Sequence, residues 1–344
     1  MSLTNRVLLI YTGGTIGMGR NPKTGALEPF DFNHLNKSLP ELSLVEAQVD
    51  VCQFSPVIDS SNMSPELWAK LIDIITRKYN SYDGFVILHG TDTMAYTASA
   101  LSFMLQNLTK PVILTGSQLP MGQLRTDGKE NVLTSLEIAS AHREDGHPIV
   151  PEVCIYFSGR LIRGNRATKI NAEGFHAFDS FNCPRLCDAG VNFKFNYHTI
   201  LQPDYSKPMT PHKSMSANVI VFSLFPGIQE SIFSHIIDAS HLRGIVMRTY
   251  GSGNAPQCEW LKNLLTRAKE RGIVVVNVTQ CARGSVEMGL YDTGYQLKEA
   301  GVISGKDMTV EAAVTKLMHL LGSYVDVDIV RQKMAQCLAG EITL

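Results

Sequence analysis

The chain has 344 residues, of which 44% are hydrophobic and 18% are charged, with 27 glycines and 15 prolines. These values exclude a disordered or low-complexity chain, because such chains hold fewer apolar residues and a larger net charge. The formal charge of −1 leaves no excess of cations to neutralise phosphates, so we do not expect nucleic acid as a partner. A chain of this length buries roughly 75% of its unfolded surface, which favours two domains.

Short apolar strands alternate with helical patterns in the first part of the chain. Helices are expected at 66–79, 93–106 and 131–142, the first of them with Ser64 as its cap and Pro65 at its first position. Strands are expected at 7–11, 85–88, 111–114 and 153–157. Apolar strands bounded by helices are typical of a parallel sheet that is covered on both faces and binds ligands at the carboxyl ends of its strands.

The pattern breaks between 192 and 217, where prolines with Asp, Ser and Lys between them indicate a linker. A second series follows, with strands at 218–222, 244–248 and 273–278 and helices at 229–237, 256–271, 309–321 and 326–338. We therefore expect an α/β fold with two parallel-sheet domains. The larger, N-terminal catalytic domain spans 1–204, a linker spans 205–217, and the smaller C-terminal domain spans 218–344.

The cysteines and apolar runs indicate a cytoplasmic protein. The seven cysteines are scattered and odd in number, which is typical of reduced thiols rather than of a secreted disulfide framework. Cys183 and Cys187 form the only short spacing, and no second pair follows at zinc-site spacing. The apolar run at 7–10 is too short for a signal peptide, and no stretch approaches the ~20 residues of a membrane helix, so we expect no membrane partner.

A glycine-rich turn at 11–19 follows the first expected strand. Dinucleotide-binding loops read G-x-G-x-x-G and open a helix, whereas Gly13 and Gly14 are adjacent and no helix follows them; the phosphate-loop pattern is also absent. What remains is Thr15 at the carboxyl end of a strand, beside glycines that let the backbone approach a ligand closely. A plain tight turn explains this loop equally well.

A second polar loop follows the strand at 85–88 and contains His89, Gly90, Thr91 and Asp92. Asp92 can anchor an ammonium group, Thr91 can offer its hydroxyl to a reacting carbonyl, and Gly90 permits a close approach of the ligand. Both side chains also stand where a helix begins, so helix capping is the alternative interpretation.

Two further segments carry suitable groups. Lys169, in the basic segment 163–169, can lower the proton affinity of a nearby threonine or hold a carboxylate, although a solvated basic loop is the simpler interpretation. Asp59, Ser60 and Ser61 form a polar loop after an extended stretch at 50–57, and the alternative there is an ordinary turn that leads to Ser64.

These residue types together suit acyl transfer to a threonine. A threonine hydroxyl is a weak nucleophile and needs a base, which a Thr–Lys–Asp relay supplies while backbone N–H groups bind the oxyanion. Attack on an amide would release ammonia, and water would hydrolyse the acyl-enzyme. The chain contains no H-E-x-x-H, G-x-S-x-G or S-x-x-K pattern, and this chemistry requires neither a metal nor another cofactor.

The same stretches resemble L-asparaginases, and closely the bacterial cytoplasmic type I enzymes. The resemblance spans nearly the whole chain. It rests on YTGGTIG at 11–17, DSS at 59–61, YDGFVILHGTDTMAY at 82–96, TGSQ at 115–118, RGNR at 163–166 followed by TK at 168–169, YG at 250–251, GNAP at 253–256 and TQC at 279–281. Two separated threonine motifs and a lysine make this pattern far more specific than a single glycine loop.

The resemblance implies that Thr15 is the nucleophile of an acyl-enzyme mechanism on L-asparagine. It implies that Thr91, Asp92 and Lys169 form the proton-handling triad, and that Asp92 also binds the α-amino group of the substrate.

The resemblance also implies a substrate-binding set, which consists of Asp59, Ser60, Ser61, Gly90 and Ser117. Ser60 and Ser61 would hold the α-carboxylate, and Ser117 would lie near the side-chain amide.

The same resemblance implies a homotetramer of tight dimers and a second, activating asparagine site. Thr168, Arg248 and Cys281 match positions associated with that site. One departure concerns the mobile loop after the first threonine motif, where family members often have a tyrosine and residues 24–30 contain none.

Alternative functions differ in what they require. Glutaminase activity beside asparaginase activity depends on one methylene of the substrate, worth only about 1–3 kcal/mol, so the sequence discriminates poorly. A non-catalytic amino-acid sensor would keep the binding loops and lose turnover, and the presence of both threonines, Asp92 and Lys169 counts against it. Nucleotide binding at the glycine turn is disfavoured by its spacing.

Overall fold

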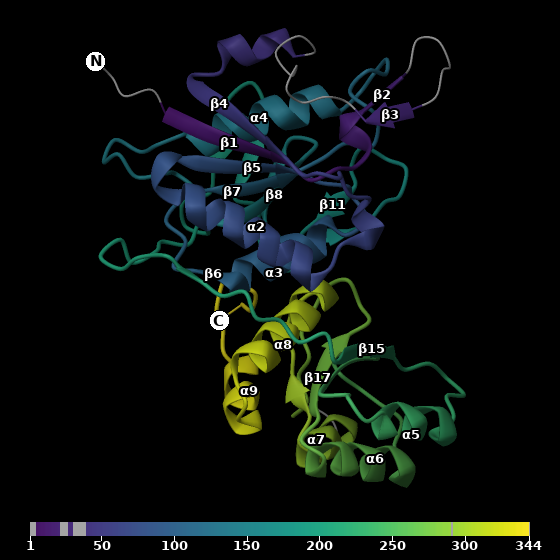
Figure 1. Ribbon diagram of the computed structural model, residues 1–344. Helices are drawn as coiled ribbons and strands as arrows, with labels where there is room; N and C mark the ends of the chain where they lie inside the picture. The colour runs from purple at the N-terminus through teal and green to yellow at the C-terminus, as the bar shows by residue number, and fades with distance from the viewer. Residues whose placement is uncertain (1–4, 21–26, 30–38, 290–291, 344) are drawn as a thin grey trace. The chain divides into compact units, whose positions relative to one another are not determined.

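The computed structural model describes residues 5–20, 27–29, 39–289 and 292–343. The chain divides into two compact units, Met1–His212 and Lys213–Leu344 (Figure 1). The boundary between them lies inside the segment 205–217 that the prolines indicate as a linker. Each unit is built on its own sheet.

In the described residues, the sheet of the first unit has eight strands in the order β13-β12-β9-β8-β7-β5-β1-β4. Five neighbouring strands are parallel and form the expected α/β sheet: β4 (Ala47–Gln53), β1 (Asn5–Tyr11), β5 (Gly84–Leu88), β7 (Val112–Thr115) and β8 (Val153–Phe157). The other three are antiparallel: β9 (Arg160–Arg163), β12 (Cys187–Ala189) and β13 (Phe193–Phe195). The sheet is therefore mixed.

The antiparallel extension was not predicted, and its cause is the turn between β8 and β9. Only Ser158 and Gly159 separate the two strands, with φ angles of 50° and 77°. Two residues with positive φ form the tight turn of a hairpin, whereas a parallel connection needs a dozen residues or more. The strand after β8 must therefore run back beside it.

Three helices cover the two faces of this sheet. Figure 1 shows α4 (Gly128–Ser140) on one face, and α2 (Pro65–Lys78) and α3 (Met94–Met104) on the other. The apolar stripe of α2 is buried, and Ser64 occupies the cap position before Pro65, although its side chain makes no capping hydrogen bond. Burial of the strands on both faces explains why their sequences are continuously apolar.

Short elements connect these strands and helices. The 3-10 turns are η1 (Thr15–Gly17), η3 (Pro40–Leu44), η4 (Ser60–Asn62), η5 (Tyr79–Ser81) and η6 (Gly164–Arg166). The short strands are β2 (Met18–Arg20), β3 (Leu27–Pro29), β6 (Leu105–Gln106), β10 (Thr168–Lys169), β11 (Phe178–Asp179) and β14 (Thr210–Pro211).

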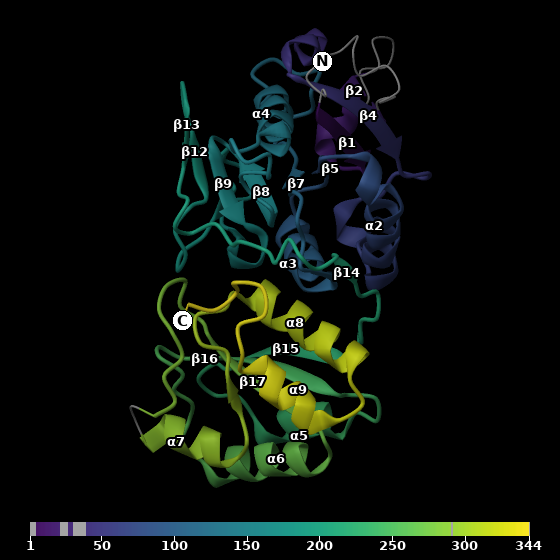
Figure 2. The same cartoon turned by 90° about the vertical axis from the view of Figure 1, so that its left-hand side faces the viewer.

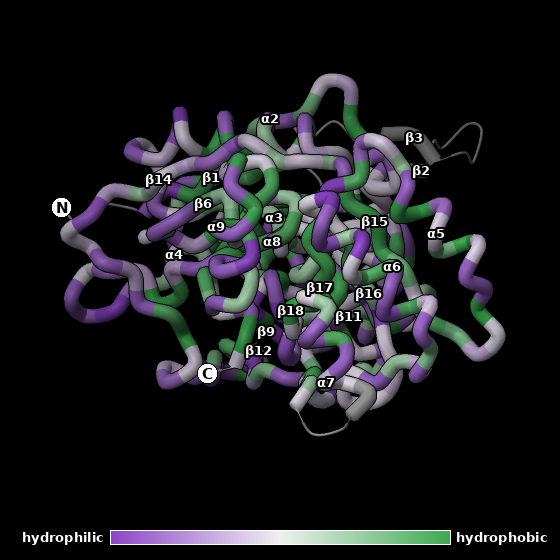
Figure 3. Tube along the Cα trace, turned by 90° about the horizontal axis from the view of Figure 1, so that it is seen from below, coloured by the Kyte–Doolittle hydropathy of each residue, from purple (hydrophilic) through white to green (hydrophobic). Residues whose placement is uncertain are grey.

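The second unit has a smaller parallel sheet, as the sequence predicts. In its described residues the strand order is β15 (Val219–Ser223), β16 (Gly244–Thr249), β17 (Val274–Thr279) and β18 (Ile303–Ser304). Figure 2 shows α8 (Val310–Ser323) and α9 (Val327–Met334) on one face of this sheet, and α5 (Glu230–Asp238), α6 (Glu259–Glu270) and α7 (Asp292–Glu299) on the other. β17 is coloured as hydrophobic in Figure 3, and every one of its residues is buried.

The segment that precedes the boundary between the units is fastened to the first unit. The Asn107 side chain donates hydrogen bonds to the carbonyls of Asp204 (3.0 Å) and Lys207 (2.8 Å), and the Asp204 N–H donates to Asn107 Oδ1 (2.9 Å). The ring of Tyr205 stacks on that of His147 at 3.8 Å, and β14 pairs with β6. Residues 204–212 are thus part of the first unit.

Three findings are limited to the described residues. Within them, no helix is both long and apolar enough to cross a bilayer. In the same part of the chain, no three His, Cys, Asp or Glu side chains are grouped to hold a metal ion. All seven cysteines lie there as free thiols.

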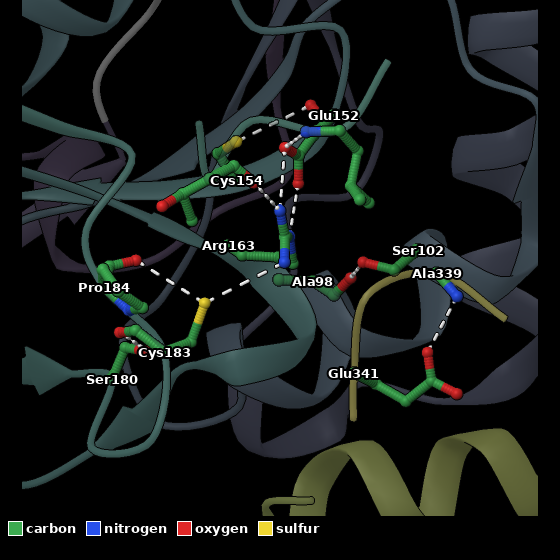
Figure 4. Close-up of polar contacts among 12 residues, drawn as sticks. Ala98, Ser102, Glu152, Cys154, Arg163, Ser180, Cys183, Pro184, Ala339 and Glu341 are labelled. Carbon is green, nitrogen blue, oxygen red and sulfur yellow. Dashed lines mark hydrogen bonds and ion pairs between the residues drawn. The ribbon is translucent and has the colours of Figure 1, made fainter. Parts of the chain in front are cut away.

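A buried ion pair ties β8 and β9 to the chain that follows them (Figure 4). Arg163 Nε lies 2.6 Å from Glu152 Oε2, and the two side chains are only 7% and 4% exposed. Arg163 Nη2 also donates to the carbonyl of Thr199 (2.6 Å), and the Leu201 N–H donates to Glu152 Oε1 (2.6 Å). Burial is tolerated because both charges are paired and hydrogen-bonded.

A second buried chain of hydrogen bonds reaches the loop after β5. His89 Nδ1 lies 2.7 Å from the Gly90 carbonyl, which can only accept, so Nδ1 carries the proton. His89 Nε2 then accepts from the Thr97 hydroxyl (2.9 Å), whose oxygen accepts from Trp68 Nε1 (3.0 Å). Burial lowers the pKa of His89 to about 4, so the ring is neutral and holds the Gly90 peptide in place.

Arg163→Met is expected to lower the free energy of unfolding by about 3–5 kcal/mol, because it leaves the Glu152 carboxylate buried and unpaired. Urea denaturation measures this loss. Arg185→Met is the matched control, since the Arg185–Asp188 pair is 36% and 56% exposed and should contribute less than about 1 kcal/mol. Equal effects of the two substitutions would contradict the role of the buried pair.

His89 is expected to make stability depend on pH. Its pKa of about 4 lies below the reference value of 6.5, so between these pH values the unfolded chain binds a proton that the folded chain does not. Its contribution is complete above pH 6.5 and falls by about 3 kcal/mol as the pH drops to 4. The difference in unfolding free energy between the parent and His89→Asn should shrink accordingly. A difference that stays constant between pH 6.5 and 4 would contradict this role of His89.

Candidate active site

The candidate residues follow the carboxyl ends of four neighbouring parallel strands. In the order β7-β5-β1-β4, these strands lead to the loops that carry Ser117, Thr91 with Asp92, Thr15, and Asp59 to Ser61 respectively. The chain passes from β1 to β4 on one side and then to β5 on the other, so the strand order reverses between β1 and β5. Ligands of open α/β sheets bind at such a reversal, and Thr15 and Thr91 belong to the two loops that flank it.

Adjacent glycines bring the loop after β1 into backbone contact with its neighbours. A Cβ atom on Gly13, whose φ is +141°, would lie 2.0 Å from the Ile58 carbonyl oxygen. One on Gly14, whose φ is +94°, would lie 2.6 Å from Gly90 Cα. Only glycine fits at either position, so the glycine pair places Thr15, which is exposed at the start of η1, directly after a contact with the loop that carries Thr91.

The loop of Asp59, Ser60 and Ser61 packs against the same point. A Cβ atom on Gly90 would lie 2.4 Å from Ser60 Oγ, and the Thr93 hydroxyl donates to the Ser60 carbonyl (2.7 Å). The Asp59 carboxylate accepts from the N–H and the hydroxyl of Ser61, both at 2.9 Å, and these bonds lower the pKa of Asp59. Asp59 thereby remains a carboxylate and shapes the turn that presents the two serines.

Lys169 joins this group from a distant part of the sequence. Its Nζ donates to Thr91 Oγ1 (2.8 Å) and to Asp92 Oδ1 (2.6 Å), across 78 and 77 residues of chain. The antiparallel pairing of β10 with β11 sets Lys169 opposite Phe178, which fixes the backbone from which it reaches. The Lys169 side chain is 19% exposed and that of Asp92 is 68% exposed. A hydroxyl held by an ammonium beside a carboxylate is suited to proton transfer.

The loop after β7 contains one predicted residue and one that the sequence did not single out. Ser117 is 2% exposed, and its hydroxyl donates to the Leu119 carbonyl (2.6 Å). The Oε1 atom of Gln118 lies 3.4 Å from Thr91 Oγ1. Its place at the end of the motif at 115–118 could have indicated a role in the site, because a side chain there can reach the adjacent loop.

Thr168, Arg248 and Cys281 are divided between the two units. Thr168 precedes Lys169 in β10 of the first unit. Arg248 lies near the end of β16 in the second unit, and Cys281 follows β17, with its N–H donating to Thr279 Oγ1 (3.0 Å). Within neither unit does the structure bring all three together. The loop without a tyrosine, 24–30, lies outside the described residues except for 27–29.

Comparisons with known proteins cover nearly the whole sequence. A family model described as "Asparaginase, N-terminal" matches residues 6–201, and one described as "Glutaminase/Asparaginase C-terminal domain" matches residues 218–334. The chain is 44% identical to "L-asparaginase 1" of Escherichia coli (strain K12), over 98% of each chain.

Two solved structures extend the likeness to three dimensions. L-asparaginase I from Vibrio cholerae O1 biovar eltor str. N16961 superposes with a TM-score of 0.90 at 41% identity, over 99% of this chain and 100% of that one. The thermostable L-asparaginase from Thermococcus kodakarensis superposes with a TM-score of 0.88 at 31% identity, over 98% and 99%. Both halves of the sequence and the fold of the whole lead to one conclusion: the chain belongs to the asparaginase family.

Proposed function

We propose that this chain is an amidohydrolase that converts L-asparagine and water to L-aspartate and ammonia through a threonine acyl-enzyme. The observation that carries the proposal is the contact of Lys169 Nζ with both Thr91 Oγ1 (2.8 Å) and Asp92 Oδ1 (2.6 Å), in a member of the asparaginase family. Nucleotide binding at the glycine turn is disfavoured, because Gly13 and Gly14 are occupied by backbone contacts with the neighbouring loops.

In this proposal the Thr15 oxygen attacks the side-chain amide carbon of asparagine. The Thr15 proton passes by way of the Thr91 hydroxyl to the leaving nitrogen, so that Thr91 ends the step with one hydrogen and Lys169 keeps its ammonium. Ammonia departs and an ester to Thr15 remains. Water then attacks the ester, and its proton passes along the same path to the departing Thr15 oxygen, which yields aspartate and restores the Thr15 hydroxyl. Lys169 favours these steps because its positive charge stabilises a developing alkoxide on threonine.

Substrate binding is assigned to groups around the relay. Asp92, which is paired with Lys169 through its Oδ1 atom, would bind the α-amino group. Ser60 and Ser61 would bind the α-carboxylate. Asp59 supports Ser61 through two hydrogen bonds. The backbone of Gly90 would line the site, because a residue without a side chain lets a ligand approach the backbone closely. Ser117 would contact the amide after its hydroxyl leaves the Leu119 carbonyl.

The remaining parts of the proposal rest on the resemblance to type I enzymes. They are a cytoplasmic location, a homotetramer built from tight dimers, and a second, activating asparagine site with Thr168, Arg248 and Cys281. The domain bounds proposed from the break in the sequence pattern are 1–204 and 218–344, with 205–217 between them. Glutamine remains a competing substrate, because a single methylene changes transition-state binding by only about 1–3 kcal/mol. Side-by-side release of ammonia from asparagine and glutamine measures the preference.

Thr15→Ala is expected to abolish ammonia release from asparagine, because it removes the proposed nucleophile while leaving the backbone contacts of Gly13 and Gly14 in place. Asparagine binding, measured by calorimetry, and the circular dichroism spectrum should change little. Turnover that survives in Thr15→Ala would place the nucleophile elsewhere. A parent chain that binds asparagine without releasing ammonia would instead support a sensor.

Lys169→Met is expected to lower kcat for asparagine by a thousandfold or more, on the order of 4 kcal/mol, because the relay loses its cation. The coupled ammonia assay measures the loss. Lys129→Met is the matched control: Lys129 pairs with Glu41 at 3.4 Å on the surface, and its replacement should leave kcat within twofold. A loss below tenfold in Lys169→Met would contradict the proposed relay.

The proposed activating site is tested by steady-state kinetics over a wide range of asparagine concentration. Binding at a second site that favours an active state makes the rate sigmoidal in substrate concentration. Arg248→Ala is expected to change the curve towards a hyperbola by weakening the second site. Hyperbolic kinetics of the parent chain would remove the activating site from the proposal and leave the hydrolytic reaction untouched.

A further inference from the structure

Gln118 is a polar side chain that contacts the relay without a role in the mechanism described above. Its Nε2 donates to the Gly174 carbonyl (3.0 Å), and its Oε1 lies 3.4 Å from Thr91 Oγ1. The contact with Gly174 decides the orientation of the amide, because a carbonyl oxygen accepts and only the NH₂ group can donate to it. The Oε1 atom is therefore the end of Gln118 that faces Thr91.

The hydrogen-bond inventory of Thr91 then assigns its proton. Thr91 Oγ1 has one hydrogen and two lone pairs. Lys169 Nζ has no acceptor capacity and donates to one lone pair at 2.8 Å. The hydroxyl hydrogen is free to point at Gln118 Oε1, and the second lone pair is left open to accept a hydrogen bond from the Thr15 hydroxyl. A separation of 3.4 Å is long for this bond, but catalytic hydrogen bonds commonly tighten in the substrate complex.

The position of Gln118 is fixed from two further directions. The Asp127 carboxylate accepts from the N–H groups of Gln118 (2.9 Å) and Leu119 (3.1 Å), which holds the loop backbone at the start of α4. The turn that carries Gly174 is itself closed by Asn171, whose Oδ1 accepts from the Gly174 N–H (2.8 Å). Gln118 is thus aimed at Thr91 by anchors on both sides.

We propose that Gln118 is a positioning residue that accepts the Thr91 hydroxyl hydrogen and so turns the free lone pair of Thr91 towards the reacting groups. The proposal rests on the proposed function, because it assigns Gln118 to the same relay. Gln118 touches no reacting atom in this account and acts through Thr91. Its effect should therefore appear in kcat and not in the binding of substrate.

The first test replaces Gln118 by leucine, which removes the acceptor without adding charge. We expect kcat for asparagine to fall about tenfold, with KM within twofold and an unchanged melting temperature. Gln118→Glu, which keeps an oxygen at the Oε1 position, should retain more activity than Gln118→Leu. Gln123→Leu, in the same loop, is the matched control and should match the parent. Equal kcat in Gln118→Leu and the parent would overturn the proposal.

A double-mutant cycle distinguishes action through Thr91 from a general loosening of the site. In the Thr91→Val background the hydroxyl is absent, so Gln118→Leu should cause no further loss of the residual kcat. A further tenfold loss in that background would show that Gln118 acts elsewhere and would overturn the assignment.

Failure of the proposed function has a different signature, namely a parent chain that releases no ammonia from asparagine or glutamine. The positioning claim is then decided by a high-resolution crystal structure of the parent. Gln118 Oε1 within hydrogen-bond distance of Thr91 Oγ1 supports the claim, and a separation above about 4 Å overturns it.

Discussion

The candidate site depends on close packing between loops that glycine permits. Gly13, Gly14 and Gly90 each lie where a Cβ atom would fall 2.0–2.6 Å from an atom of a neighbouring loop. The loops after β1, β4 and β5 can therefore pack against one another at the carboxyl edge of the sheet. The backbone holds the hydroxyls and carboxylates that follow these contacts near one another, and Lys169 adds a positive charge to this group.

Buried polar groups behind these loops make the arrangement rigid. Neutral His89 holds the Gly90 peptide through a chain of bonds that begins at Trp68, and Asp127 holds the backbone of Gln118. Arg163 of β9 pairs with Glu152, which directly precedes β8, just before the segment that carries Lys169. Each of these groups is buried or half-buried and satisfied, so disturbing one carries a desolvation penalty. The loops are therefore held in place by groups that take no part in the proposed chemistry.

Much of the α/β fold could be predicted from local patterns, and the reason is physical. Apolar runs such as 85–88 and the stripe of 66–79 reflect burial that is decided within each element. The antiparallel strands beyond β8 depend on the φ angles of Ser158 and Gly159, which periodicity does not encode. The contact of Lys169 with Thr91 spans 78 residues, so it could be expected from the family resemblance but not from the spacing of the residues. Gln118 carries no motif of its own, and only the orientation of its amide shows what it faces.

The anchoring of residues 204–212 decides where the first unit ends as a physical object. Asn107 takes up the left-handed backbone conformation, with φ of 55°, and satisfies its side chain entirely on carbonyl and N–H groups of this segment. A fragment cut after residue 201, where the family likeness of the first half stops, would strip those partners from Asn107 and leave β6 without β14. For recombinant expression of the first unit alone, the informative end point is His212.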